Sequence, residues 1–124
     1  MAVQANVATD ENIGGMIDAL AAVYEFRDEP AVRAFLANNA DLFPVLSEIP
    51  DRISAYLPPT DQRPALEVFE DPENEAAPPQ LVVYVPTHLR PPKARQSLNR
   101  FSRDWWLDAF RRAGLRLHVD IEYR

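Results

Sequence analysis

The segment from Pro91 to Gly114 constrains the fold most, because it holds both tryptophans of the chain and much of its positive charge. Wound as a helix at about 100° per residue, it gathers its apolar side chains on one continuous arc. Gly114 suits the end of such a helix, and Ser102 could cap a second half if the helix breaks there. The sequence therefore predicts a core helix whose opposite side faces water. The arc comprises Leu98, Phe101, Trp105, Trp106, Ala109, Phe110 and Ala113.

Three other segments have the patterns of β-strands. Residues 65–70 alternate in polarity, and residues 81–85 form a nearly continuous β-branched run of the kind found in strands buried on both faces. Residues 115–123 alternate strictly between apolar and polar side chains. Prolines and acids separate the first two segments and predict a wide hairpin loop.

The strict alternation of the last strand predicts which side chains are buried. Leu117 and Val119 should face the core, while Arg116 and His118 should face water. A structure with the opposite parity would contradict this assignment.

The first half of the chain is predicted to be helical. Residues 1–15 are polar and contain glycine, so we expect a mobile N-terminal tail. Apolar residues at helical spacing predict three helices, over 16–27, 30–39 and 41–57. Pro50 lies inside the third, where it removes one backbone hydrogen bond, and we expect a kink or a break there.

These elements predict one α+β domain over residues 16–124, in the order helix-helix-helix-strand-strand-helix-strand. The helix between the last two strands makes them parallel by the crossover rule. We expect a small, mainly antiparallel three-stranded sheet with the first strand in the middle, in the order 2-1-3, and with the helices packed on one face.

Composition excludes several classes of protein. The chain has 124 residues, which suits one domain, and its 47% hydrophobic and 26% charged residues are typical of a folded protein. It has no cysteine, so disulfides and thiolate chemistry are excluded. No signal peptide or membrane-spanning run is visible. We therefore expect a cytoplasmic protein that does not bind membranes.

The net charge of −6 is unevenly distributed along the chain. Residues 1–80 contain fifteen acids and four bases, and residues 81–124 contain four acids and nine bases, giving −11 and +5. The opposite charges favour docking of the two halves. The excess of acid argues against nucleic acid as the partner.

No motif for catalysis is present. The chain lacks a nucleophile elbow and a phosphate-binding glycine loop, so we expect neither enzymatic activity nor a cofactor. The most site-like pattern is a same-face pair, His118 and Asp120. Same-face neighbours on a strand are about 6.6 Å apart, so a metal site would need a further ligand, such as Asp71 or Glu73 in the hairpin loop.

The adjacent tryptophans favour a binding surface instead. Neighbours on a helix point about 100° apart, so both rings need not be buried. Tryptophan and arginine are enriched where interfaces bind most tightly. The predicted interaction residues are Arg100, Arg103, Trp106 and Arg111. An alternative, a nucleic-acid surface, would use Lys93, Arg95, Arg100 and Arg103.

The chain contains five ordered blocks: FLANNADL (35–42), LEVFEDPE (66–73), LVVYV (81–85), FSRDWWLD (101–108) and VDIEY (119–123). The second and the fourth have the most specific residues, and the other three are ordinary core patterns. In these blocks the chain resembles a group of short bacterial proteins, found in cyanobacterial-type genomes, for which no activity is established. The resemblance implies an α+β domain and no catalytic residue. Small proteins of this kind are often one partner of a two-gene cassette.

The leading hypothesis is a non-enzymatic protein–protein interaction module, one partner of a two-gene, toxin–antitoxin-like cassette. We expect a protein partner or a homo-oligomer. The alternatives are a metal-dependent hydrolase or nuclease that uses the His118 and Asp120 strand face, and a nucleic-acid-binding adaptor that uses the basic helix 91–113.

Overall fold

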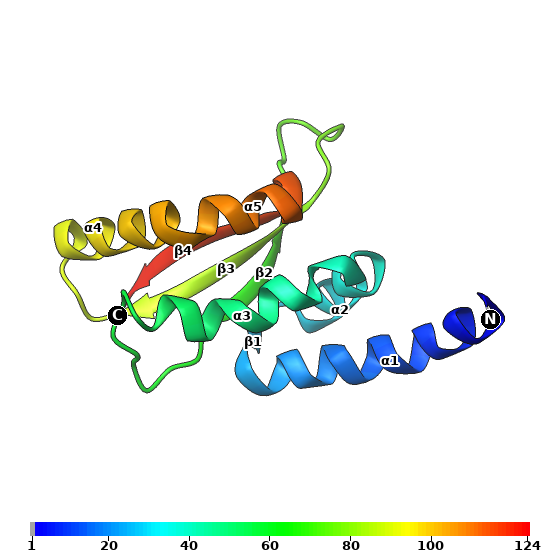
Figure 1. Cartoon of the computed structure of the whole chain (residues 1–124). Helices are drawn as coiled ribbons and strands as arrows, with labels where there is room; N and C mark the ends of the chain where they lie inside the picture. Colours follow the sequence, from blue (N-terminus) through cyan, green and yellow to red (C-terminus); the bar gives the residue numbers. More distant parts are fainter. Residues whose placement is uncertain (1) are drawn as a thin grey trace.

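A four-stranded mixed sheet organises the molecule (Figure 1). Its strands β1 (Glu25–Phe26), β2 (Ala65–Phe69), β3 (Gln80–Thr87) and β4 (Leu117–Tyr123) lie in chain order. β2 and β3 are antiparallel, whereas the pairs β1–β2 and β3–β4 are parallel. The computed structural model describes the backbone of residues 2–124 and the side chains of residues 12–124 other than 112 and 115.

The α+β class is confirmed, but the predicted sheet is wrong in three respects. It has a fourth strand, two of its three pairings are parallel, and β3 rather than β2 is the middle one of the three strands that were predicted. Leu81, Val82 and Val83 are all buried although they alternate between the two faces, as expected of an inner strand whose side chains are flanked by those of β2 and β4. β1 was missed because a strand of two residues has no detectable period.

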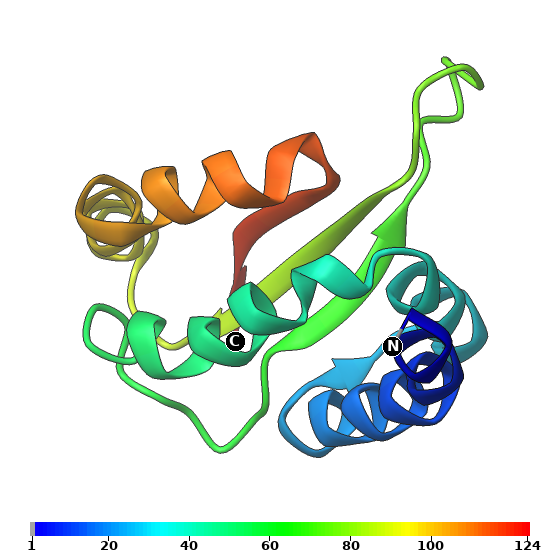
Figure 2. The same ribbon diagram turned by 45° about the vertical axis from the view of Figure 1, so that its right-hand side comes forward.

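The helices follow the predicted order with different limits. α1 (Ala2–Val23) begins well before residue 16 and includes most of the segment predicted as a tail, whose mobility stays a prediction. α2 (Glu29–Asn38) is followed by a 3₁₀ turn, η1 (Ala40–Leu42), and by α3 (Phe43–Ile53). Figure 2 shows α1 and α2 together at the β1 edge of the sheet.

The predicted long helix is a rod of three segments that runs along the strands (Figure 1). α4 (Pro91–Phe101) continues into a π-helix, η2 (Ser102–Trp106), and then into α5 (Leu107–Ala113). A 3₁₀ turn, η3 (Gly114–Arg116), leads to β4. Gly114 has φ 69°, which explains why glycine ends the rod.

The hydrophobic core lies on one face of the sheet. The core residues of β4 are Leu117, Val119 and Ile121, and they join residues of α2, α3, α4 and α5. Leu117 is 1% and Val119 5% exposed, while His118 is exposed, so the predicted parity is confirmed for the strand itself. Arg116 is half-buried because it belongs to η3 and turns back toward η1.

No helix in the described part of the chain is both long enough and apolar enough to span a bilayer.

Candidate interaction surface

A π-helix brings the aromatic residues of the rod together. The N–H of Leu107 donates to the carbonyl of Ser102, five residues back, whereas the spacing in an α-helix is four residues. Each hydrogen-bonded turn of η2 therefore contains one extra residue. Positions five apart therefore align. The rings of Phe101 and Trp106 stack with centroids 6.4 Å apart and planes 11° apart. Trp106 is only 7% exposed and belongs to the core.

Trp105 lies beside this stack and is partly exposed. Its ring is tilted against Phe101, with centroids 5.6 Å apart, and against Trp106, at 6.2 Å. The guanidinium of Arg52, near the end of α3, lies 5.7 Å from the centroid of the Trp105 ring. Trp105 is therefore held on one side by the core and on the other by a cation.

Tyr56 repeats this arrangement just after α3. Its ring meets Phe101 edge-on, with centroids 5.8 Å apart, and Arg100 lies 5.7 Å from its centroid. The Tyr56 hydroxyl donates to Asp104 Oδ2 at 2.9 Å, and this bond raises the pKa of Tyr56 above its usual value. Asp104 in turn is paired with Arg103, at 3.9 Å.

Together these residues form what we call the aromatic–arginine surface. It combines two partly exposed rings, three arginines and one acid from two separate stretches of the chain. Its members are Arg52, Tyr56, Arg100, Arg103, Asp104 and Trp105.

The predicted interaction residues fall in different environments. Arg100 and Arg103 are exposed on this surface, and Arg111 is exposed further along the rod on α5. Trp106 is buried, and Trp105 is the ring that water reaches. Helical periodicity did not separate the two tryptophans because it assumes an α-helix where the chain forms a π-helix. Whether any of these residues contacts a partner stays a prediction.

Sequence reasoning missed Arg52 and Tyr56. They lie about fifty residues before Trp105, and no local pattern links the end of α3 to the rod. The only available signal was the pair of adjacent tryptophans, since a second ring that cannot share the core face needs another neighbour.

The predicted metal ligands are not gathered into a site. His118 is exposed and Asp120 is half-buried on the face of the sheet opposite the core. Asp120 Oδ1 accepts the N–H of Ile121 at 2.8 Å, and Asp71 Oδ1 accepts the N–H of Glu73 at 2.9 Å. Among the described side chains, no three from His, Cys, Asp and Glu are close enough to share an ion.

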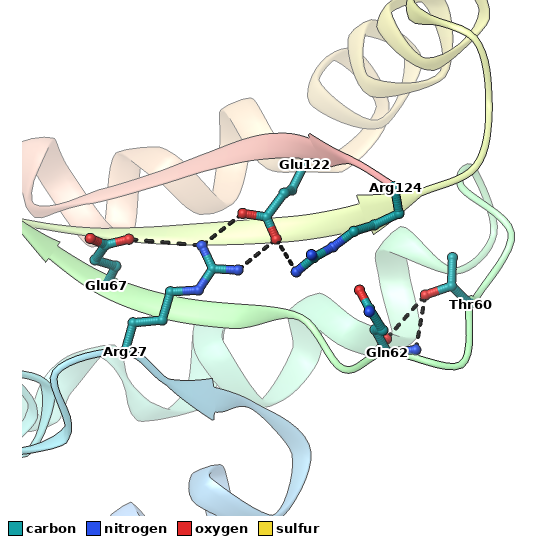
Figure 3. A network of polar contacts seen from close by, with 6 residues as sticks. All are labelled: Arg27, Thr60, Gln62, Glu67, Glu122 and Arg124. Carbon is teal, nitrogen blue, oxygen red and sulfur yellow. Dashed lines mark hydrogen bonds and ion pairs between the residues drawn. The ribbon is translucent and has the colours of Figure 1, made fainter.

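The same open face carries a network of ion pairs (Figure 3). Arg27, just after β1, reaches across β2 and β3 to Glu122 on β4, with Nη1–Oε2 and Nη2–Oε1 distances of 2.7 and 2.5 Å. On the way its guanidinium passes 5.2 Å from the centroid of Tyr84. Glu67, at 3.8 Å from Arg27, and Arg124, at 2.7 Å from Glu122, complete the network.

This network is built to hold strands together. Hydrogen bonds from Arg27 hold the pKa of Glu122 below its usual value, and the same bonds raise the pKa of Arg27. Charges that satisfy one another in this way are poorly suited to bind a charged ligand. A smaller turn nearby is closed by Thr60, whose Oγ1 accepts the N–H of Gln62 at 3.1 Å (Figure 3).

Compared with known proteins, the chain matches no family model, no curated protein and no solved structure.

Proposed function

We propose that this chain is a protein-interaction module and that the aromatic–arginine surface is where it contacts its partner. The observation that carries this proposal is that two partly exposed aromatic rings, Trp105 and Tyr56, each lie against an arginine, at 5.7 Å in both cases. Tryptophan, tyrosine and arginine are the residues that contribute most at protein interfaces.

The surface is also pre-organised. Both rings pack on Phe101, which is fully buried, so their positions are set by the core before a partner arrives. Little side-chain freedom is then lost on binding. By contrast, the side chain of Leu107, one residue beyond the π-helix, is 57% exposed.

The charge of the surface indicates the chemistry of the partner. Arg52, Arg100 and Arg103 outnumber the single acid Asp104, which is already bonded to Tyr56. An acidic segment with one or two apolar side chains would complement it, because carboxylates pair with guanidinium groups while an apolar group covers Trp105. A toxin–antitoxin-like partner from a two-gene cassette remains a hypothesis about which protein supplies that segment.

The test is capture of the tagged full-length chain from its own source, followed by native mass spectrometry. We expect a second protein in stoichiometric amount with the wild type and with Leu107→Ala, the control for loss of an exposed apolar side chain. Trp105→Ala and Arg100→Glu should each lose it. If both variants retain the complex, the aromatic–arginine surface is not the contact site.

A second candidate function is a nucleic-acid adaptor. It is favoured by the exposure of all four predicted basic residues, Lys93, Arg95, Arg100 and Arg103. Arg95→Glu separates the two functions, because Arg95 lies outside the aromatic–arginine surface. The substitution makes the same charge change as Arg100→Glu. Nucleic-acid binding should fall in both variants and weaken steeply with salt. Binding of an oligonucleotide that ignores salt would reject this candidate.

The metal-dependent hydrolase or nuclease has no comparable observation in its favour. Its test is calorimetric titration with manganese or zinc. Saturable heat that disappears in His118→Ala would revive it.

A further inference from the structure

The free edge of β4 is the second surface that stands out. β4 is the last strand of the sheet, and no described strand pairs with its outer side. We propose that two copies of this chain associate through antiparallel pairing of their β4 edges, with the two-fold axis at Val119. This dimer is separate from the contact made by the aromatic–arginine surface.

The backbone of β4 offers hydrogen-bonding groups in the right places. In parallel pairing, alternate residues turn both N–H and C=O to the same neighbour. The N–H of Arg124 donates to the carbonyl of Thr87 on β3 at 3.0 Å, so even-numbered residues of β4 bond to β3. The backbone N–H and C=O groups of the odd-numbered residues therefore point away from β3, toward the free edge. Val119 and Ile121 are among these residues, and their side chains still face the core. A second strand could accept and donate along this row.

Charge selects the register. With the axis at Val119, His118 of each copy lies opposite Asp120 of the other, on the open face, and these two pairs are complementary. An axis at Asp120 would place that carboxylate opposite itself. An axis at Ile121 would place Asp120 opposite Glu122 twice. The first register alone places each His118 opposite an acid without pairing acids with acids.

The same register continues the core face. Leu117 of one copy lies opposite Ile121 of the other, and both are core residues in the single chain. Since residues directly opposite in an antiparallel pair point to the same side, the two sheets would join with apolar faces aligned. About six backbone hydrogen bonds would form between the strands.

One contact within the chain competes with this pairing. Asp120 Oδ1 accepts the N–H of Ile121 at 2.8 Å, and that N–H is one of the outward donors. In the dimer the N–H of Ile121 would donate to Leu117 of the second copy instead. The released carboxylate would then lie opposite His118 of the second copy. The N–H of Ile121 and the carboxylate of Asp120 therefore each have a partner in both states. The N–H bonds within the chain in the monomer and to the second copy in the dimer.

The experiment uses charge reversal on the full-length chain, followed by sedimentation velocity. His118→Glu makes the cross-strand pairs repulsive and Asp120→Lys removes the carboxylate that accepts from His118, and each should raise the dissociation constant of the dimer about tenfold or more. Mixed in equal amounts, the two variants should recover a dimer of one chain of each kind, because the introduced glutamate faces the introduced lysine. Asp61→Lys, an exposed loop position, is the control for the same change of charge and should dimerise like the wild type.

Three results would overturn the proposal. The first is a wild-type chain that stays monomeric at about 1 mM, the level at which weak association becomes visible. The second is a dimer that both charge reversals leave unchanged, since the contact would then lie elsewhere. The third is failure of the mixed variants to associate while each alone retains the far-ultraviolet circular dichroism of the wild type. Loss of a foreign partner in Trp105→Ala would leave this dimer intact, so the two proposals fail separately.

Discussion

The buried hydroxyl of Tyr24 donates a hydrogen bond to the carbonyl oxygen of Leu46 at 2.7 Å. In an uninterrupted α-helix that carbonyl would accept the N–H of residue 50, but residue 50 is proline and has no N–H. Tyr24, the residue after α1, therefore replaces the bond that Pro50 removes from α3. Burial raises the pKa of Tyr24 well above its usual value, so the hydroxyl stays protonated and remains a donor.

We predict that Tyr24→Phe lowers the free energy of unfolding by about 1–3 kcal/mol, because it leaves a buried carbonyl without a donor. Chemical denaturation measures this. Tyr56→Phe is the matched control: its hydroxyl bonds to an exposed carboxylate, and the loss should be within about 0.5 kcal/mol.

A double-mutant cycle tests the assignment of the bond to Pro50. In Pro50→Ala the new N–H can satisfy the Leu46 carbonyl, so Tyr24→Phe should be less harmful in that background. We expect a coupling of about 1 kcal/mol. Strictly additive effects would show that the tyrosine does not compensate for the proline.

We predict that Glu122 makes folding stability depend on pH in the acidic range. Arg27 lowers its pKa in the folded chain, so the group stabilises the fold above its unfolded pKa of about 4.3, and this stabilisation is lost as pH falls through the lower folded value. Glu122→Gln should remove this part of the pH dependence and reduce stability at pH 7 by about 1 kcal/mol.

The ion pair of Arg116 with Asp41 provides a comparison on the other side of the molecule. It is also bidentate, at 2.9 and 2.6 Å, and it lowers the pKa of Asp41, as Arg27 lowers the pKa of Glu122. The Asp41 side chain is 61% exposed, against 26% for Glu122, so water screens it more. Asp41→Asn should therefore have the smaller effect. Equal effects in urea titrations between pH 2 and 7 would contradict this reasoning.

The two tryptophans should separate stability from binding. Trp106→Ala removes a buried ring and should lower the free energy of unfolding by about 3–5 kcal/mol. Trp105→Ala should have a clearly smaller effect on thermal unfolding, because water already reaches that ring, yet it should abolish partner capture. Comparable destabilisation by both variants would contradict the assignment of Trp105 to the surface.

The π-helix can be tested by deleting one residue. Buried positions before η2 include Ala94, Leu98 and Phe101, and they resume at Trp106 with one residue more than an α-helix needs. Deletion of Arg103, which is exposed, should therefore leave α4 and α5 in phase and keep cooperative unfolding. Partner capture should be lost, because Trp105 and Tyr56 no longer share Phe101. Complete unfolding of the deletion variant would show that the wide turn is needed for folding itself.

Patterns within one element were predicted well. The alternation of residues 117–123 identified the buried side of β4, and the apolar arc of residues 98–113 identified the core side of the rod. Relations between distant elements were not predicted. The bond from Tyr24 spans 22 residues and the pair of Arg27 with Glu122 spans 95, and neither has a local sequence pattern.

The sequence by itself determined the α+β class, the approximate segments of α2 to α5 and of β2 to β4, and the side that β4 and the rod turn inward, because burial periodicity is a property of a single element. Only the tertiary structure decided the strand order, the short strand β1 and the choice of which tryptophan is buried. Those features depend on which elements meet. β3 lies inside the sheet because it pairs with β2 on one side and with β4 on the other, and Trp106 is the buried tryptophan because the π-helix stacks its ring on Phe101.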